Sequence, residues 1–400
     1  MKYLSSEKVN TGRQPEIDIL KAICVISMIF IHTVQGCAPG SKGILLDIII
    51  WFNGLFGLGV FIVCAGIGMR YSRHQEPKDN AIRGVALLTI SQLVNLLRSA
   101  IPGLAAFLIT GDHMFIPYML DVFTSDVLTF FGLSFLLMAL LKKLKLRDGW
   151  ILAIGLAMNQ LTTLLSGVIK IPEAFWSHRI LGLFILTDDA LFPLGIHFVM
   201  VAFGYLIGGI YPYISDKDKM ANRVLLSCIP ISVIYITLRM NVPFPMMPEY
   251  ILEDEPTVGL DSVVLCLNVL ILLFIVYKIC RLTNGKIPAF LSHLSKNVNS
   301  YYCICEVLIG NTMLILLSVF GRSMQTQWMP YLFTLLVLAV CYLCITFNAR
   351  FIHFTINGLQ GSKRMIVYTA IWIVSLTMVF YALSKVTDPA DMMTHFVLGE

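Results

Sequence analysis

Charge is the scarcest property of this 400-residue sequence, because only 13% of its residues are Asp, Glu, Lys or Arg. Soluble domains carry about 25% of such residues, whereas here 57% are hydrophobic and the mean hydropathy is +0.80. No internal repeat, low-complexity tract or soluble segment interrupts the hydrophobic sequence. The composition therefore excludes a soluble globular protein and predicts one membrane-embedded domain over residues 1–400.

Patterns that would bind a metal are also missing. The eight histidines are scattered, and no His-x-x-x-His pair or carboxylate cluster provides the spacing of metal ligands. Most of the ten cysteines lie inside hydrophobic runs, where a thiol behaves as a small apolar side chain. Cys341-x-x-Cys344 lacks the strand–helix context of a redox motif. We therefore expect no metal and no disulfide framework.

What the sequence does contain is a series of hydrophobic runs, each long enough to cross a bilayer as a helix. They predict an all-α polytopic membrane protein, a bundle of about 10–11 transmembrane helices. The least regular are the third, which polar residues interrupt, and the fourth, which contains Asp126. The predicted spans cover residues 19–38, 45–69, 82–101, 122–141, 150–169, 189–211, 223–240, 259–281, 299–320, 329–348 and 366–385.

Basic residues are distributed unevenly between alternate ends of these spans. If the N-terminus is cytosolic, most of the 29 Lys and Arg residues lie at cytosolic ends, as the positive-inside rule requires. We therefore expect a multi-pass cell-membrane protein in contact with lipid, and a net charge of +5 that reflects topology and not nucleic-acid binding. Residues 101–121, 170–188 and 241–258 are expected on the outer side, where they shape a substrate entrance or are ordinary loops.

Lys21 and His32 lie eleven residues apart in the first span. Eleven residues make about three helical turns, so both side chains share one face, roughly 16 Å apart along the axis. An ionisable residue deep in a membrane is costly and marks a functional path by default. Imidazole is also the common proton acceptor in catalysis. The alternative is a histidine that only hydrogen-bonds between helices. Asp18 is expected to pair with Lys21 at i,i+3 spacing.

Other polar residues interrupt the later spans and are second candidates for the site. Asp126 or Glu306 could orient a histidine by accepting its second N–H. Arg98 or Arg239 could stabilise an oxyanion or hold an acidic acceptor. Each could equally be a polar contact that joins two helices. The candidates for substrate binding are Asn53, Arg98, Arg239 and His197.

Several segments resemble one family. RQPEIDILKAICVISMIFIH is similar to the first-span signature of the transmembrane acyltransferase superfamily, which includes the acyltransferase-3 proteins and the heparan-glucosaminide N-acetyltransferase-like bacterial proteins. In that signature an Arg or Lys precedes a His by the same spacing, and Lys21 takes the place of the commoner Arg. FGLGVFIVCAGIGMRYSRH, TSDVLTFFGLSFLLMALLKKL, LFPLGIHFVMVAFGYLIGG and LSHLSKNVNSYYCICEVLIG resemble later segments in the same order.

The resemblance covers residues 13–310, and residues 311–400 add further transmembrane helices. Two departures stand out. Only Arg83 lies where many acyltransferase-3 members have an Arg-x-x-Arg pair, and Glu306 lies near a position where some relatives have His.

The resemblance implies an acyl-CoA-dependent O- or N-acetyltransferase, which moves an acetyl or similar group from cytosolic acyl-CoA to an extracytoplasmic sugar. A cell-envelope glycan and a bacterial plasma membrane follow from the same resemblance. Basic residues at cytosolic span ends could bind the phosphates of acetyl-CoA, although topology alone also places them there. They are Lys21, Arg70, Arg73 and Arg83. His32 could act as a general base or carry the acyl group itself.

The alternative reading is a secondary transporter or a flippase for glycans or lipids. Such proteins also contain charged residues near the membrane midplane. Many of them have two related halves with broken helices at matching positions. No such symmetry is visible here, so the sequence favours the acyltransferase.

Overall fold

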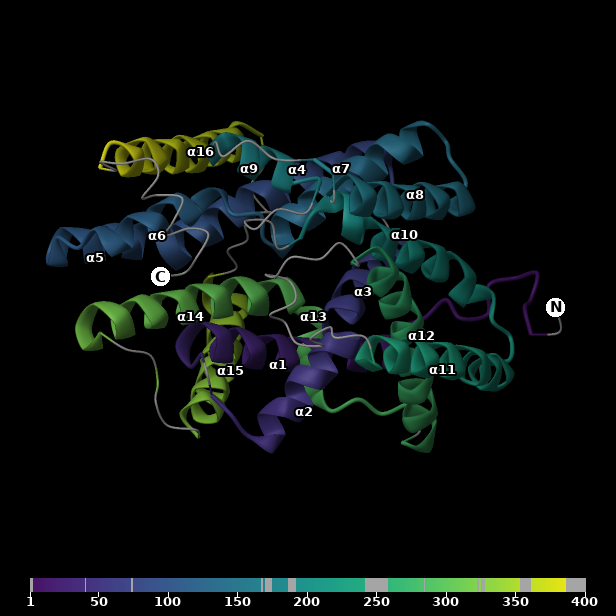
Figure 1. The fold of residues 1–400 in the computed structure, drawn as a ribbon. Helices are drawn as coiled ribbons and strands as arrows, with labels where there is room; N and C mark the ends of the chain where they lie inside the picture. The colour runs from purple at the N-terminus through teal and green to yellow at the C-terminus, as the bar shows by residue number, and fades with distance from the viewer. Residues whose placement is uncertain are drawn as a thin grey trace.

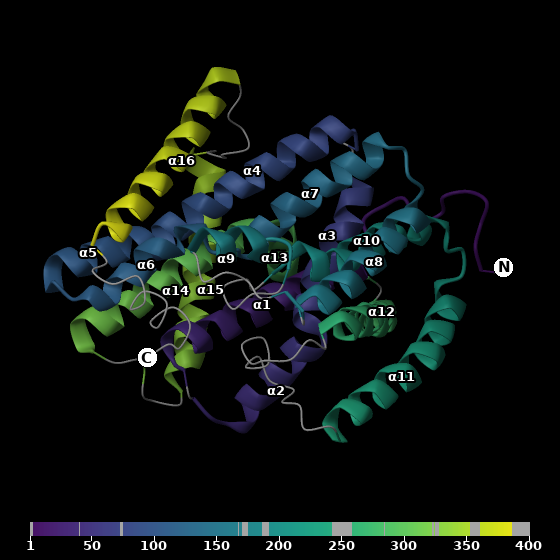
Figure 2. The ribbon, with the colours of Figure 1, turned by 45° about the horizontal axis from the view of Figure 1, so that its top comes forward.

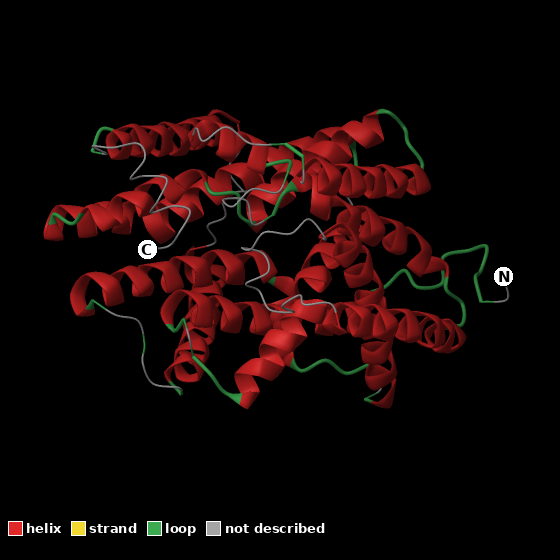
Figure 3. Ribbon diagram, in the orientation of Figure 1, coloured by secondary structure: helices red, strands yellow, loops and turns green. Residues whose placement is uncertain are grey.

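The computed structural model describes residues 3–39, 41–72, 75–166, 168–169, 175–185, 192–241, 258–283, 285–321, 324, 328–352 and 361–385. Regular structure in these residues is helical, apart from one isolated bridge between Leu4 and Ile214. Figure 3 shows the helices in one colour, with short loops between them.

The elements follow one another in a simple order. They are α1 (Pro15–Cys37), α2 (Ile44–Phe52), η1 (Asn53–Gly57), α3 (Leu58–Tyr71), α4 (Pro77–Asn95), η2 (Leu96–Ala100), α5 (Ile101–Thr110), η3 (His113–Phe115), α6 (Ile116–Leu120), η4 (Asp121–Phe123), α7 (Val127–Lys143), α8 (Asp148–Ser166), α9 (Phe175–Gly182), α10 (Leu194–Ile210), η5 (Tyr211–Tyr213), α11 (Lys217–Asn241), α12 (Val258–Leu282), α13 (Ala289–Lys296), α14 (Val298–Phe320), α15 (Met329–Phe347), η7 (Asn348–Ile352) and α16 (Gly361–Leu383).

Ten of the described helices are long and apolar enough to cross a membrane. The predicted all-α polytopic fold is therefore confirmed. The fourth predicted span corresponds to α7, which has 17 residues and at 1.5 Å per residue is about 26 Å long. It is the predicted span that is not among the ten, although about 17–25 residues suffice to cross a bilayer, and it packs along α4.

The prediction of an outer loop at residues 101–121 is wrong. The third span is longer than expected, because α4, η2 and α5 form one unbroken helix from Pro77 to Thr110. Pro102 lies inside this helix, although a proline ring clashes with the carbonyl four residues earlier. In the structure the π-helical turn η2 lies just before it, so the helix widens there and continues. Short helices fill the rest of the segment.

Close contact between α3 and α10 sits at the centre of the bundle. A Cβ atom on Gly66 would lie 2.9 Å from the backbone nitrogen of Tyr205, and one on Gly204 would lie 3.0 Å from the Cα atom of Val63. Small residues at helix contacts let membrane helices approach backbone to backbone. The pair fixes the position of α3, which carries one wall of the site described below.

The helices near the site come from both ends of the chain. In Figure 1, α1 and α14 lie together on one side of the bundle, and α4, α7 and α8 lie on the other. The helix α1 contacts α3, α12, α13, α14 and α15, and α14 also contacts η2. Figure 2 shows α16 lying across α4 at the outside. The first helix is therefore enclosed by later ones, and its polar residues face the interior.

Candidate active site

One face of α1 lines two adjoining cavities. Lys21 and Cys24 line a cavity of about 340 Å³, and Cys24, Met28, His32 and Gln35 line a second cavity of about 190 Å³. These residues recur at intervals of three or four, the spacing of one helix face. The predicted common face of Lys21 and His32 is therefore confirmed. We call the two the Lys21 cavity and the His32 cavity.

His32 belongs to a chain of three ionisable side chains. Its Nδ1 atom contacts Oε1 of Glu306, and Nη1 of Arg98 donates to Oε2 of the same carboxylate at 2.8 Å. The Glu306 side chain is 6% exposed, whereas that of His32 is 34% exposed. Glu306 therefore uses both oxygens inside the protein, and the Nε2 edge of His32 is left for the cavity. Glu306 takes the orienting position that the sequence suggested for it.

Asp126 was the other candidate for orienting His32, and the structure places it in a neighbouring cluster. It caps the N-terminus of α7, where its Oδ1 atom accepts from the backbone N–H of Thr129 at 2.8 Å and from Oγ of Ser91 at 2.7 Å. Its Oδ2 atom accepts from the Tyr302 hydroxyl at 3.5 Å. The Tyr302 ring meets His32 edge to face, 6.3 Å between centroids. Asp126 thus reaches His32 only through Tyr302.

Two π-helical turns supply further polar side chains to the same region. Arg98 lies on η2, and Asn53 lies at the start of η1 and lines the His32 cavity. The Asn53 amide donates to the carbonyl of Ile49 at 3.0 Å. Such π turns in α-helices occur frequently at functional sites. Both turns interrupt otherwise regular helices.

Gly310 allows η2 to reach α14. A Cβ atom at this position would lie 2.6 Å from the carbonyl oxygen of Arg98 and would also contact the Arg98 side chain. We expect Gly310→Ala to push η2 away and to break the Arg98–Glu306 bond, with a loss of activity of at least tenfold. Steady-state rates with a thermal midpoint for each variant measure this. Gly149→Ala is the matched control, because Gly149 also lies in a helix, its Cβ atom would meet nothing within 4 Å, and it lines neither cavity. Full activity of Gly310→Ala would contradict the close contact.

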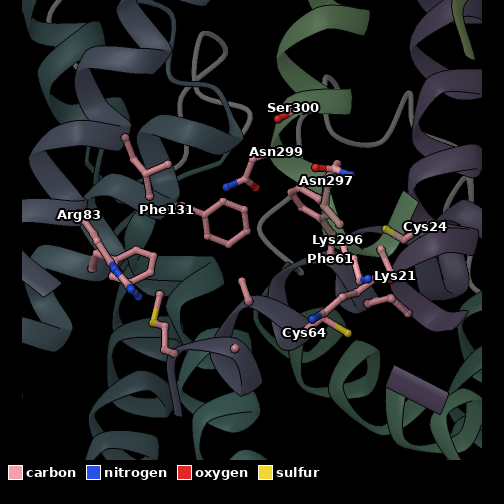
Figure 4. A pocket seen from close by; sticks show the side chains of 18 residues that line it. Lys21, Cys24, Phe61, Cys64, Arg83, Phe131, Lys296, Asn297, Asn299 and Ser300 are labelled. Carbon is pink, nitrogen blue, oxygen red and sulfur yellow. The ribbon is translucent and has the colours of Figure 1, made fainter. Parts of the chain in front are cut away.

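The Lys21 cavity is cationic. Lys21, Arg83 and Lys296 line it, and no Asp or Glu does among its described lining residues. Figure 4 shows Arg83 on one side of the cavity, with Lys21 and Lys296 on the other. The expected pair of Asp18 with Lys21 is wrong, because Asp18 accepts from Arg13 instead. Lys21 therefore forms no ion pair with Asp18, and its ammonium group lines the cavity.

The N-terminus of α14 opens into the same cavity. Asn297, Asn299 and Ser300 line it, and the first N–H groups of a helix have no partner within the helix. This end of a helix carries a partial positive charge. Burial and the charge of Lys296 also lower the pKa of His293, which lies on α13 just before this point. A helix terminus and three basic side chains thus act together on anything bound there.

The remaining predicted residues lie elsewhere or partly outside the described structure. Arg70 donates to the Tyr205 hydroxyl at 2.9 Å, pairs with Asp148 at 3.1 Å, and lines a different cavity of about 330 Å³. Arg83 also donates to Ser72 at 3.0 Å. Arg73 lies outside the described residues.

Two further candidates for substrate binding differ in how far the structure places them. Arg239 belongs to α11, but its side chain is outside the described part. His197 is buried, with its ring against Phe130 and Phe192, and Phe192 lines the His32 cavity.

Several residues at the site were not singled out from the sequence. Phe61 lines both cavities, Tyr302 lines the His32 cavity, and Lys296 and Asn297 line the Lys21 cavity. A signal was present in the segment LSHLSKNVNSYYC, where polar residues gather just before a span.

Among the described residues, no group of three or more His, Cys, Asp or Glu gathers in a way that would hold a metal ion.

The fold and the site together define a polytopic membrane protein with a histidine–carboxylate pair beside a cationic cavity. Residues 13–233, more than half of the chain, match the family described as heparan-alpha-glucosaminide N-acetyltransferase, catalytic. The chain belongs to this family of transmembrane acetyltransferases. Comparisons with curated proteins and with solved structures gave no match.

Proposed function

We propose that this membrane acetyltransferase takes its acetyl group from acetyl-CoA in the Lys21 cavity and transfers it to an acceptor in the His32 cavity. The observation that carries the proposal is the junction of the two cavities, which share Cys24 and Phe61. A cationic cavity suits the donor's phosphates, and a histidine with an oriented ring suits the transfer itself. Donor binding is thus assigned to the Lys21 cavity, and acetyl transfer to the His32 cavity.

Binding of the donor is supported by the charges around the Lys21 cavity. Phosphate oxygens bind well to Lys, to Arg and to the N–H groups at a helix N-terminus. Lys21, Lys296 and the start of α14 provide these groups together. Among the described residues no carboxylate forms an ion pair with Lys21 or Lys296, so both charges are available to a ligand. The pantetheine arm then extends along α1 toward His32.

In the transfer step, His32 acts as the general base. Its Nε2 atom takes the proton from the acceptor hydroxyl or amine as that group attacks the thioester carbonyl. The carbon–sulfur bond then breaks, and the proton on Nε2 passes to the departing thiolate of CoA. Glu306 holds Nδ1–H and faces the imidazolium that forms, while Arg98 holds Glu306 in place.

The acceptor is proposed to be a sugar of a cell-envelope glycan, reached from the outer side of a bacterial plasma membrane. Basic clusters at alternate ends of the predicted spans support a cytosolic N-terminus by the positive-inside rule. Lys21 lies near the start of α1 and His32 near its end. Donor and acceptor would therefore enter from opposite sides. No nucleic acid is part of this proposal.

Calorimetric titration with acetyl-CoA tests the donor site. A hydrogen bond to a charged group is worth about 1.5–3 kcal/mol, so Lys21→Ala should weaken acetyl-CoA binding by roughly tenfold to a hundredfold. His32→Ala should leave the affinity within about threefold, because His32 lies beyond the Lys21 cavity. Lys42→Ala is the matched control, since Lys42 is exposed and lines neither cavity.

The titration also separates the two readings of the chain. If folded wild-type protein binds no acetyl-CoA, the proposed donor is wrong, and a transporter or flippase becomes the better interpretation. If Lys21→Ala and Lys42→Ala weaken binding equally, the donor binds at another place than the Lys21 cavity.

A further inference from the structure

The two cavities adjoin at a small number of side chains. Among the described lining residues, only Cys24 and Phe61 border both cavities. Cys24 comes from α1 and Phe61 from α3. An acyl group that enters from the Lys21 cavity must therefore pass between these two side chains to reach His32.

Phe61 stands between two aromatic walls. Its ring centroid is 5.4 Å from that of Phe131, which lines the Lys21 cavity, and 6.5 Å from that of Tyr302, which lines the His32 cavity. Both neighbours are well buried, at 5% and 3% exposure. On the opposite side the Cys24 thiol donates to the carbonyl of Gly57 at 3.4 Å. The Phe61 ring is thus held at the junction and limits its width.

Space beyond the junction is limited as well. The His32 cavity has about 190 Å³, little more than half of the 340 Å³ of the Lys21 cavity. An acetyl group and the reacting atoms of an acceptor fit into this volume. A chain of eight carbon atoms would occupy space that the acceptor needs. Apolar side chains form much of its wall, among them Leu58, Val127 and Leu265. The polarity of the wall would therefore accept a longer acyl chain, and the limit on chain length is the space available.

We propose that the Phe61 ring selects the donor by acyl-chain length and restricts the enzyme to short-chain thioesters of CoA. This inference rests on the proposed function, because it assumes that the donor lies in the Lys21 cavity. Phe61 acts here as a specificity-determining residue. Removing its ring joins the two cavities and gives a longer chain a place along the aromatic wall.

The test measures the affinity of the purified full-length protein for free CoA and for its acetyl, butyryl and octanoyl thioesters by calorimetry. Wild type should bind acetyl-CoA at least tenfold more tightly than octanoyl-CoA. Phe61→Ala should reduce this preference to threefold or less, and the affinity of each variant for free CoA is the reference for its own thioesters. Phe56→Ala is the matched control, because it removes the same ring five residues away, where it lines neither cavity.

The possible failures are distinct from one another. If wild type binds neither CoA nor any thioester, the proposed donor is wrong and the inference falls with it. If wild type binds acetyl-CoA but shows no chain-length preference, or if Phe61→Ala keeps the wild-type preference, the donor site stands and the role of Phe61 is wrong. If Phe61→Ala does not fold, Phe61→Leu keeps part of the volume and should still relax the preference by at least threefold.

Discussion

Replacing His32 with alanine should lower the rate of acetyl transfer by about 10²- to 10⁴-fold, the usual contribution of a general base. Among the described residues that line the His32 cavity, three have titratable side chains: His32, Tyr302 and Cys24. Initial rates of CoA release from acetyl-CoA measure the effect, with glucosamine as the acceptor probe. His32→Gln should be equally impaired, because an amide keeps hydrogen bonds but cannot take a proton.

The same assay separates a base from an acyl carrier. As a base, His32 releases no CoA until the acceptor is present. As a carrier it would release a burst of CoA, about one equivalent per enzyme, without any acceptor. Activity of His32→Ala close to that of wild type, in protein that is folded and binds acetyl-CoA, would contradict any catalytic role.

Breaking the pair of Arg98 and Glu306 should have the largest effect on stability. Removing one partner of a buried ion pair leaves the other charge uncompensated, at a cost of about 3–5 kcal/mol. Here the Glu306 side chain is 6% exposed and the Arg98 side chain 21%. Both Arg98→Met and Glu306→Met should therefore lower the thermal midpoint strongly. Size-exclusion chromatography after heating measures this midpoint in detergent.

The double replacement distinguishes structure from catalysis. Arg98→Met with Glu306→Met removes both charges, so most of the lost stability should return. The double variant should remain impaired in transfer, because His32 then has no carboxylate at Nδ1. Lys219→Ala is the control for a surface pair, since Lys219 is 69% exposed in its contact with Asp216 and such pairs contribute about 0–1 kcal/mol. A stable Glu306→Met variant with normal activity would contradict the proposed chain of charges.

Local sequence patterns were enough to predict most of the fold. Hydrophobic length gave the helical spans, because a membrane helix satisfies its own backbone hydrogen bonds and needs no partner to be recognised. The errors were in the bounds of elements. The helix that begins at Pro77 continues past Pro102 through the π turn η2, and α7 begins at Val127, later than the predicted start of the fourth span at residue 122. The cytosolic N-terminus and the single domain remain predictions.

The site was predictable only along one helix. The spacing of Lys21 and His32 needs no tertiary information, so their common face was correct. The partner of His32 comes from α14, and the sequence left both Asp126 and Glu306 as candidates because nothing local places either beside α1. Asp18 had two basic neighbours within reach along the chain, and the structure pairs it with Arg13. Phe61 could not be identified from the sequence, because it is an ordinary apolar residue whose proposed role follows only from its position between two cavities.

The unbroken helix from Pro77 to Thr110 has 34 residues and is therefore about 51 Å long. The hydrocarbon core of a bilayer is about 30 Å thick, and a tilt near the average of about 20° shortens the helix by only a few Å. Its far end exposes Leu108 and Ile109, which favour lipid over water. Arg98 is fixed on this helix and pairs with Glu306, so we expect the thickness of the surrounding bilayer to influence the position of the Arg98 side chain relative to Glu306.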